Sequence, residues 1–153
     1  MATVRVQKDD FDPGAEAEAL ARGRTDVGAV VTFVGYCRDE GGSLAALELE
    51  HYPGMAEDEI ARAAGEAEAR WPLLAATVIH RYGRIAPGER IVLVAVAAQH
   101  RGAAFAAAEM LMDYLKTRAP LWKRAIRRDG AVEGWIESKK EDDRSAARWS
   151  AAD

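Results

Sequence analysis

Apolar residues occur with two periodicities along the chain, and each periodicity predicts one kind of secondary-structure element. Short runs that are apolar throughout, or apolar at every second position, predict β-strands. They cover residues 3–7, 27–36, 44–52, 75–82 and 90–98. Segments whose apolar residues lie three or four positions apart predict helices with one buried face. These cover residues 55–71, 103–117 and a short segment, 15–21, that follows Pro13.

The strands differ in the surroundings that they predict. Residues 3–7 alternate, which is typical of an edge strand, whereas the nearly continuous apolar run of residues 27–36 indicates a buried strand. We expect this buried strand to form a hairpin with residues 44–52. The connecting loop, residues 39–43, places paired glycines beside charged side chains, which favours a loop that moves.

The last part of the chain predicts a further, smaller β region. Residues 123–128 and 131–137 can form two short strands around Asp129-Gly130, a dipeptide typical of tight hairpins. Residues 138–153 are polar apart from Trp149 and indicate a tail or an arm. The order β-α-β-β-α-β-β-α-β-β is that of a single mixed α+β domain over residues 1–153.

Composition narrows the class of protein. A chain of 153 residues is long enough for one domain with a sizeable core. A single cysteine excludes an internal disulfide and favours a reducing, cytoplasmic compartment. There is no signal-peptide pattern and no apolar run of membrane-spanning length, so we expect no membrane association. The formal net charge of −4 argues against sequence-independent nucleic-acid binding.

Against this acidic background, residues 112–128 form a basic stretch that has no acid after Asp113. Such a stretch is either a solvated face or a site for an anion. Lys116 lies only about 20° from Phe105 around a helix axis, so it borders the expected apolar stripe. That stripe contains Phe105, Ala108, Met112 and Leu115. Partial desolvation there would make the amine a usable base, although a surface lysine with a buried stem also fits.

Other side chains could act with Lys116. Lys123 follows Pro120-Leu121-Trp122, a stiff wall that suits a planar ring, although a core tryptophan beside a solvated lysine fits too. His100 and Arg101 stand where a strand passes into a helix, whose free N–H groups favour an anion. Arg38, in the loop after residues 27–36, could reach the same place, and the three side chains together would suit a phosphate.

Cys37 and the remaining histidines are weaker candidates. A small thiol at the end of a buried strand favours packing over nucleophilic chemistry. His51 and His80 are expected to be structural. Together with Cys37 and His100 they show no metal-ligand spacing, so the sequence predicts no metal site.

Longer motifs then indicate a family. The chain resembles the large, catalytic subunit of molybdopterin synthase from about Gly28 to Trp149. The resemblance rests on GAVVTFVGYCRDE, LELEHYPGMAEDEI, RWPL, VIHRYGRIAPGE, QHRGAAFAAAEMLMDYLKTRAPLWKR and SAARW. It implies an α/β-hammerhead-like mixed sheet with packed helices and a small additional β subdomain.

The resemblance also implies a transferase of molybdenum cofactor biosynthesis. That family adds two sulfurs to cyclic pyranopterin monophosphate (precursor Z) and so forms the dithiolene of molybdopterin. Each sulfur arrives as a thiocarboxylate on the C-terminal Gly-Gly of a small ubiquitin-like carrier subunit. The catalytic subunits form a homodimer within a heterotetramer, and this sulfur transfer requires no cofactor or metal on the protein.

Carried over by position, the resemblance makes Lys116 the essential lysine and Lys123 the second active-site lysine. The positions of substrate contact are Tyr36, Cys37, Arg38, His100, Arg101, Arg124 and Ala125. The family commonly has a glutamate where this chain has Ala125. Any proton-transfer or orienting role of that glutamate is therefore lost here or supplied by another residue.

Other functions remain open from the residues alone. The basic stretch could dock a ubiquitin-like tail or a phosphorylated ligand without chemistry, which would make the chain a binding module. A lysine Schiff-base enzyme acting on a small carbonyl compound is another alternative. Nucleic-acid binding fits least, because the stretch offers only Trp122 and Tyr114 for stacking on bases.

Overall fold

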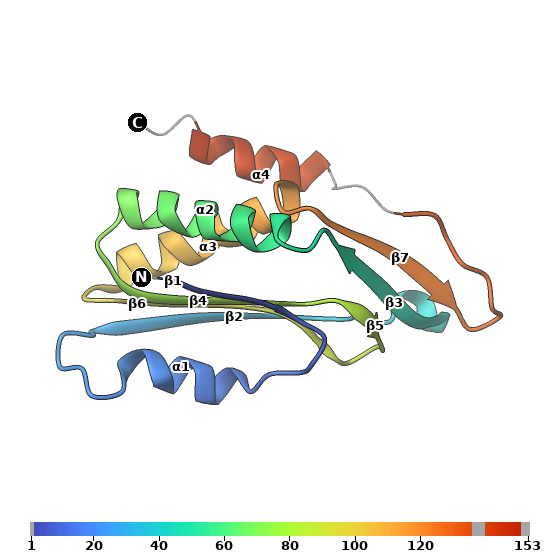
Figure 1. The fold of residues 1–153 in the computed structure, drawn as a ribbon, viewed down its shortest axis with the longest axis horizontal. Helices are drawn as coiled ribbons and strands as arrows, with labels where there is room; N and C mark the ends of the chain where they lie inside the picture. The colour runs from blue at the N-terminus through green and yellow to red at the C-terminus, as the bar shows by residue number, and fades with distance from the viewer. Residues whose placement is uncertain (1, 136–139, 151–153) are drawn as a thin grey trace.

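Strands and helices alternate along the chain in a mixed α+β arrangement, as the apolar pattern predicts (Figure 1). The structure is a computed structural model that describes residues 2–135 and 140–150. In chain order the elements are β1 (Ala2–Gln7), α1 (Pro13–Ala21), β2 (Ala29–Tyr36), the 3₁₀ turn η1 (Glu40–Gly42), β3 (Leu44–His51), α2 (Met55–Arg70), β4 (Leu73–Arg81), β5 (Gly83–Ile85), β6 (Arg90–Ala98), α3 (Arg101–Thr117), β7 (Leu121–Arg127) and α4 (Lys140–Ser150).

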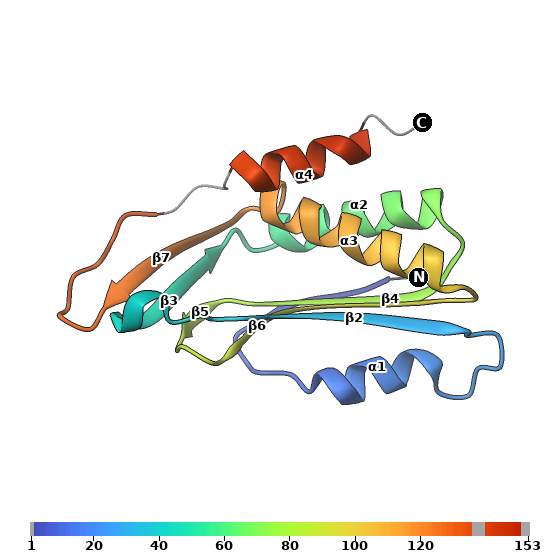
Figure 2. The same ribbon diagram turned by 180° about the vertical axis from the view of Figure 1, so that it is seen from behind.

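The larger sheet has the strand order β1-β4-β6-β2, with β1 parallel to β4 and the other neighbours antiparallel. Helix α1 covers one face and helices α2 and α3 cover the other (Figures 1 and 2). Side chains alternate between these faces along β6. Val92, Val94 and Val96 therefore pack in the core under α2 and α3, whereas Leu93 and Ala95 pack in the core beside α1.

Of the two edge strands of this sheet, the apolar pattern predicted one correctly and the other wrongly. β1 is an edge strand, as its alternation predicts. β2 is the opposite edge strand and not a buried one, since Phe33 and Tyr36 are 41% and 53% exposed. Its run is nevertheless apolar because both faces are covered: Val31 packs on the side of α2 and α3, and Val30 on the side of α1.

Helix α3 buries half of the expected stripe, Ala108 and Leu115, together with other residues. The buried residues are Ala104, Ala107, Ala108, Met110, Leu111, Tyr114 and Leu115. Phe105 is 60% exposed and Met112 is only partly buried. Small alanine side chains allow the helix to lie close to the sheet, so they determine which line faces the core. The larger Phe105 remains at the side of the helix.

The smaller sheet is antiparallel, with the order β5-β3-β7, and extends from one end of the molecule (Figure 2). The predicted hairpin between residues 27–36 and 44–52 is therefore wrong: β2 pairs with β6, and β3 pairs with β5 and β7. After β2 the chain turns through η1, where Gly41 and Gly42 adopt positive φ. This turn sends β3 into the second sheet.

The predicted hairpin after β7 forms only in part. The turn is present, and Gly130 takes the positive φ that suits it. Beyond it, a single bridge joins Ile126 to Val132, so residues 131–135 do not form the expected second strand. Residues 136 and 137, which were included in that strand, lie outside the described residues.

Helix α4 lies within the segment that was expected to be a polar tail or arm. Trp149 meets Trp71 edge-on with ring centroids 5.7 Å apart, and its indole N–H donates to a carboxylate oxygen of Asp113. Arg148 pairs with the same Asp113 carboxylate. These contacts hold α4 against α3 and the end of α2. No helix in the described part of the chain is both long and apolar enough to cross a membrane.

Candidate active site

A cavity of about 160 Å³ lies where the two sheets meet the C-terminal end of α3. Residues from both sheets, from α3 and from α4 line it. Its polar lining includes Lys116 and Lys123, the two lysines expected to be catalytic, together with His80 and Asp142. The structure thus brings two amines from separate elements to one pocket.

The end of α3 places Lys116 at this pocket. Lys116 is exposed and stands in the last turn of the helix. The next residue, Thr117, donates through its hydroxyl to the carbonyl of Asp113, and the backbone N–H of Arg118 donates to Tyr114. The Arg118 guanidinium lies 3.7 Å from the centroid of the Tyr114 ring, which fixes the helix end.

Strand alternation determines which side chains of β7 face the cavity. Leu121 and Lys123 line it, and Leu49, the register partner of Lys123 on β3, lines it too. Trp122 points to the other face and is 42% exposed, so it does not form the expected wall. Leu121 takes that place instead.

Most of the cavity wall is apolar. Phe33, Met112 and Leu115 contribute to it from β2 and α3. At Gly35 a Cβ atom would come within 2.7 Å of a methyl carbon of Val92, so only glycine fits there without a shift of the wall. An apolar wall around a few polar groups is the usual composition of a small-molecule site.

The arginines of the basic stretch pair with acids from other segments or from the following turn. Arg118 pairs with Glu66, Arg127 with Glu133 and Arg128 with Asp39. Lys116 and Lys123 line the cavity. The local charge of residues 112–128 is therefore partly used for packing and partly for the cavity.

Of the other expected contacts, only Tyr36 lines the cavity. Arg38 follows on the surface and is exposed, but it is not among the described lining residues. Cys37 is 2% exposed, and its thiol lies 3.8 Å from the carbonyl oxygen of Ile85. Burial raises the pKa of this thiol, which fits a packing role.

Arg124 and Ala125 serve the smaller sheet. Arg124 pairs with its register partner Glu48 and lies 4.5 Å from the ring centroid of Trp135, on the face opposite to Lys123. Ala125 shares the face of Lys123 but is 3% exposed, in an apolar cluster with Leu49. The carboxylate among the described lining residues comes instead from Asp142 of α4.

His100 and Arg101 stand at the opposite end of α3. Both are exposed, and His100 makes no capping hydrogen bond with its side chain. Lys116 follows Arg101 by fifteen positions along the helix, which corresponds to about 22 Å along the axis. Within one chain, these residues and Lys116 do not form a common site.

His80 is a lining residue that the sequence analysis assigned to structure. Its Nδ1 lies 2.8 Å from the carbonyl oxygen of Arg81. Burial, with smaller contributions from nearby Lys116 and His51, lowers the pKa of the imidazole from its ordinary 6.5 to about 4. The ring is therefore uncharged at neutral pH, beside two lysines.

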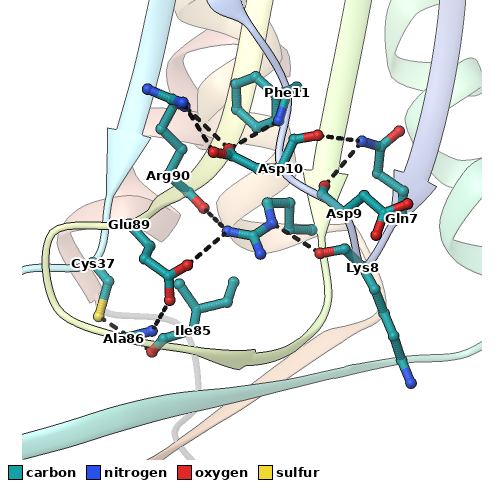
Figure 3. A network of polar contacts seen from close by, with 11 residues as sticks. Gln7, Lys8, Asp9, Asp10, Phe11, Cys37, Ile85, Ala86, Glu89 and Arg90 are labelled. Carbon is teal, nitrogen blue, oxygen red and sulfur yellow. Dashed lines mark hydrogen bonds and ion pairs between the residues drawn. The ribbon is translucent and has the colours of Figure 1, made fainter.

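A network of polar contacts joins the segment after β1 to the loop between β5 and β6 and to the start of β6 (Figure 3). The Arg81 guanidinium is buried and donates to the carbonyls of Lys8 and Arg90, at 3.0 and 2.8 Å. Glu89 accepts from the backbone N–H of Ala86 and lies 3.9 Å from Arg81. These contacts tie β4, β6 and the segment after β1 to one another.

Among the described residues, no group of three or more His, Cys, Asp or Glu side chains is placed to hold a metal ion. The polar groups of the cavity are amines, an imidazole, a phenol and a carboxylate. This set can bind an anionic, partly apolar molecule and can move protons.

The comparison with family models identifies the relationship. The model described as "MoaE protein" matches residues 6–118. The chain belongs to the MoaE family. The matched region contains Lys116 and His80 and ends before Lys123.

Full-length MoaE relatives extend the match through the rest of the chain. The chain is 62% identical to the molybdopterin synthase catalytic subunit of Mesorhizobium japonicum, over 98% of this chain and 94% of that protein. It is 60% identical to the same subunit of Rhizobium meliloti, over 97% and 96%. The family resemblance inferred from the motifs is confirmed.

Solved MoaE structures confirm the fold. The MoaE protein from Burkholderia ambifaria superposes with a TM-score of 0.84 at 48% identity, over 98% of this chain and 99% of that one. Molybdopterin synthase from Staphylococcus aureus superposes with a TM-score of 0.75 at 30% identity, over 84% and 95%.

Proposed function

We propose that this chain is the catalytic subunit of a molybdopterin synthase. It transfers sulfur from the C-terminal thiocarboxylate of a small ubiquitin-like carrier to precursor Z, and so forms the dithiolene of molybdopterin, in the cytoplasm. The observation that carries this proposal is the apolar cavity that holds both Lys116 and Lys123 in a member of the MoaE family.

The charges of the cavity suit the substrate. Precursor Z carries a cyclic phosphate, which two ammonium groups attract and hold. Opening that ring and adding sulfur both require proton transfer near the attacked carbons. Lys116, in the last turn of α3, serves as acid and base. It can also hold the terminal carboxyl group of the carrier. Lys123 stabilises the negative charge that develops during the reaction.

An open groove leads from the cavity and offers a route for the carrier's tail. It has a volume of about 450 Å³, runs between β2 and α3 past Phe33 and Phe105, and shares Lys116 and Asp142 with the cavity. A Gly-Gly tail has no side chains and can lie extended in a narrow passage. The exposed aromatic rings beside the groove would contact the body of the carrier.

A second copy of the chain completes the phosphate site in this proposal. His100 and Arg101 lie about 22 Å from Lys116 along α3, so they can serve a cavity only in a neighbouring copy. A homodimer with two-fold symmetry would place each pair of residues at the partner's cavity. Such a dimer, with one carrier on each copy, is a heterotetramer.

Reconstitution tests the proposal. The chain is mixed with thiocarboxylated carrier and precursor Z, and dithiolene formation is followed by mass spectrometry. We expect product with the wild-type chain and a loss of about 100-fold or more with Lys116→Ala, because a positioned acid-base group contributes that much. Lys8→Ala is the matched control, since Lys8 is an exposed lysine outside the cavity lining.

The possible outcomes separate the alternatives. Binding of the carrier without any product would support a binding module instead. Near wild-type turnover by Lys116→Ala would remove the assignment of that lysine. Trapping of a substrate on lysine by borohydride would favour a Schiff-base enzyme.

A further inference from the structure

The polar groups of the cavity differ in whether they can donate or accept hydrogen bonds. Lys116 and Lys123 can only donate hydrogen bonds, which suits a phosphate or a carboxylate. A pterin ring also carries donors of its own, an amino group and ring N–H groups. These donors need acceptors inside the cavity, because an unpaired polar group is costly once it leaves water.

His80 offers such an acceptor. Its Nδ1 lies 2.8 Å from the Arg81 carbonyl oxygen, and a carbonyl can only accept. The ring proton must therefore be on Nδ1, which leaves a lone pair on Nε2. Within the described residues, Nε2 has no hydrogen-bond partner, although the ring lines the cavity.

The ring is also held in place from behind. The accepting carbonyl belongs to Arg81, whose side chain is 7% exposed and bonded to two backbone carbonyls from other segments. His80 itself sits in the β4–β6 ladder opposite Val92. An acceptor anchored in this way keeps one orientation, so it can bind a planar heterocycle in one defined position.

We propose that His80 is a specificity-determining residue whose Nε2 accepts a hydrogen bond from an N–H group of the substrate's pterin ring. This inference rests on the proposed function, because it assigns to His80 the binding of the substrate's pterin ring in the same cavity. The lysines bind the anionic end of the substrate, and His80 orients its heterocycle.

The surroundings of His80 keep it suited to this role. Lys116 faces it from α3, Lys123 lines the cavity from β7, Asp142 lines it from α4, and His51 is its neighbour on β3. Burial and the adjacent positive charges keep the pKa of His80 at about 4, so it stays an acceptor throughout the neutral range. A phosphate offers no donor to such a nitrogen.

Two substitutions at His80 separate its two nitrogens. In His80→Asn the amide lies near the position of Nδ1 and can still donate to the Arg81 carbonyl, but nothing replaces Nε2. In His80→Gln the amide reaches the position of Nε2 and restores an acceptor. The probe is precursor Z, and KM and kcat are measured in the reconstituted reaction with saturating carrier.

We expect His80→Asn to raise the KM for precursor Z by about 10-fold, as the loss of one acceptor to a buried donor predicts. His80→Gln should stay within about threefold of wild type, and the KM for the carrier should not change in either variant. Equal KM values in wild type and His80→Asn would overturn the inference. A change in the KM for the carrier alone would overturn it as well.

A measurement on the wild-type chain covers the case in which these variants do not fold. The imidazole nitrogens are labelled with ¹⁵N and observed by NMR while precursor Z is added. We expect the Nε2 resonance of His80 to shift and the protonated Nδ1 resonance to stay. An unchanged Nε2 resonance with bound substrate would contradict the inference. If the wild-type chain neither binds nor converts precursor Z, the proposed function fails instead.

Discussion

Helix α3 has cationic or imidazole side chains near both ends, and the cavity that contains Lys116 and Lys123 lies at its C-terminal end. At that end the chain passes Pro120 and returns as β7, which brings Lys123 to the pocket of Lys116. At the other end β6 passes into α3 beside Gly28, where a Cβ atom would lie 2.0 Å from the carbonyl oxygen of Gln99. Charge alone therefore does not locate the site, whereas the crossing of separate segments does.

The largest effect should come from a substitution that removes cavity charge. Lys123→Ala should lower turnover by about 100-fold, because it removes a donor that stabilises developing negative charge. Arg124→Ala is the matched control, since the neighbouring Arg124 points to the opposite face and pairs with Glu48. Rates of dithiolene formation measure both. Equal losses in the two variants would show that the face of β7 does not matter.

Close packing at the other end of α3 predicts an effect on stability. Gly28→Ala should lower the free energy of unfolding by about 3 kcal/mol, because the added methyl group meets backbone rather than a flexible side chain. Gly65→Ala in α2 is the control. Nothing lies within 4 Å of its added Cβ, so alanine should stabilise that helix by about 0.5–1 kcal/mol. Urea denaturation measures both changes.

Arg101, at the N-terminal end of α3, should affect catalysis only at the cavity of a second copy of the chain. Arg101→Ala should raise the KM for precursor Z by about 10-fold, since it removes a phosphate contact. At precursor Z concentrations well below the KM, Arg101→Ala chains alone keep about a tenth of wild-type activity, and mixing them with Lys116→Ala chains should raise it to about a quarter, because half of the dimers are mixed and each has one intact site. If mixing restores nothing, the two residues do not meet across a dimer.

The smallest effect concerns stability in acid. His80 has a pKa of about 4 in the folded chain and 6.5 as its ordinary value, so below pH 6.5 the unfolded chain takes up a proton that the folded chain does not. Stability is therefore lost as pH falls from 6.5 towards 4. Between pH 7 and 5.5 we expect a loss of about 1 kcal/mol in wild type that is absent in His80→Gln. Equal pH slopes would contradict this origin.

The sequence predicted most of the regular elements because their periodicity is local. β4, β6, α2 and α3 appear within a few residues of their expected bounds. Pairing between strands is not local, which explains why the 27–36 and 44–52 hairpin was wrong. The apolar run of β2 could not distinguish a covered edge strand from a central strand.

The site was predicted in part for similar reasons. The motif around Lys116 and Lys123 identified both amines, and strand alternation over residues 121–127 could have shown that Trp122 faces away from Lys123. His80 was missed because a histidine in an apolar strand resembles a structural residue. Asp142 was missed because only long-range contacts, such as Trp149 with Asp113, hold α4 near the cavity.

Chemical protection of lysines tests most directly whether the cavity at the C-terminal end of α3 receives the substrate. The chain is acetylated with and without saturating precursor Z, and each lysine is quantified by peptide mass spectrometry. Bound substrate should protect Lys116 and Lys123 and leave Lys8 unchanged. Unaltered labelling of both cavity lysines while the substrate is bound would contradict the account.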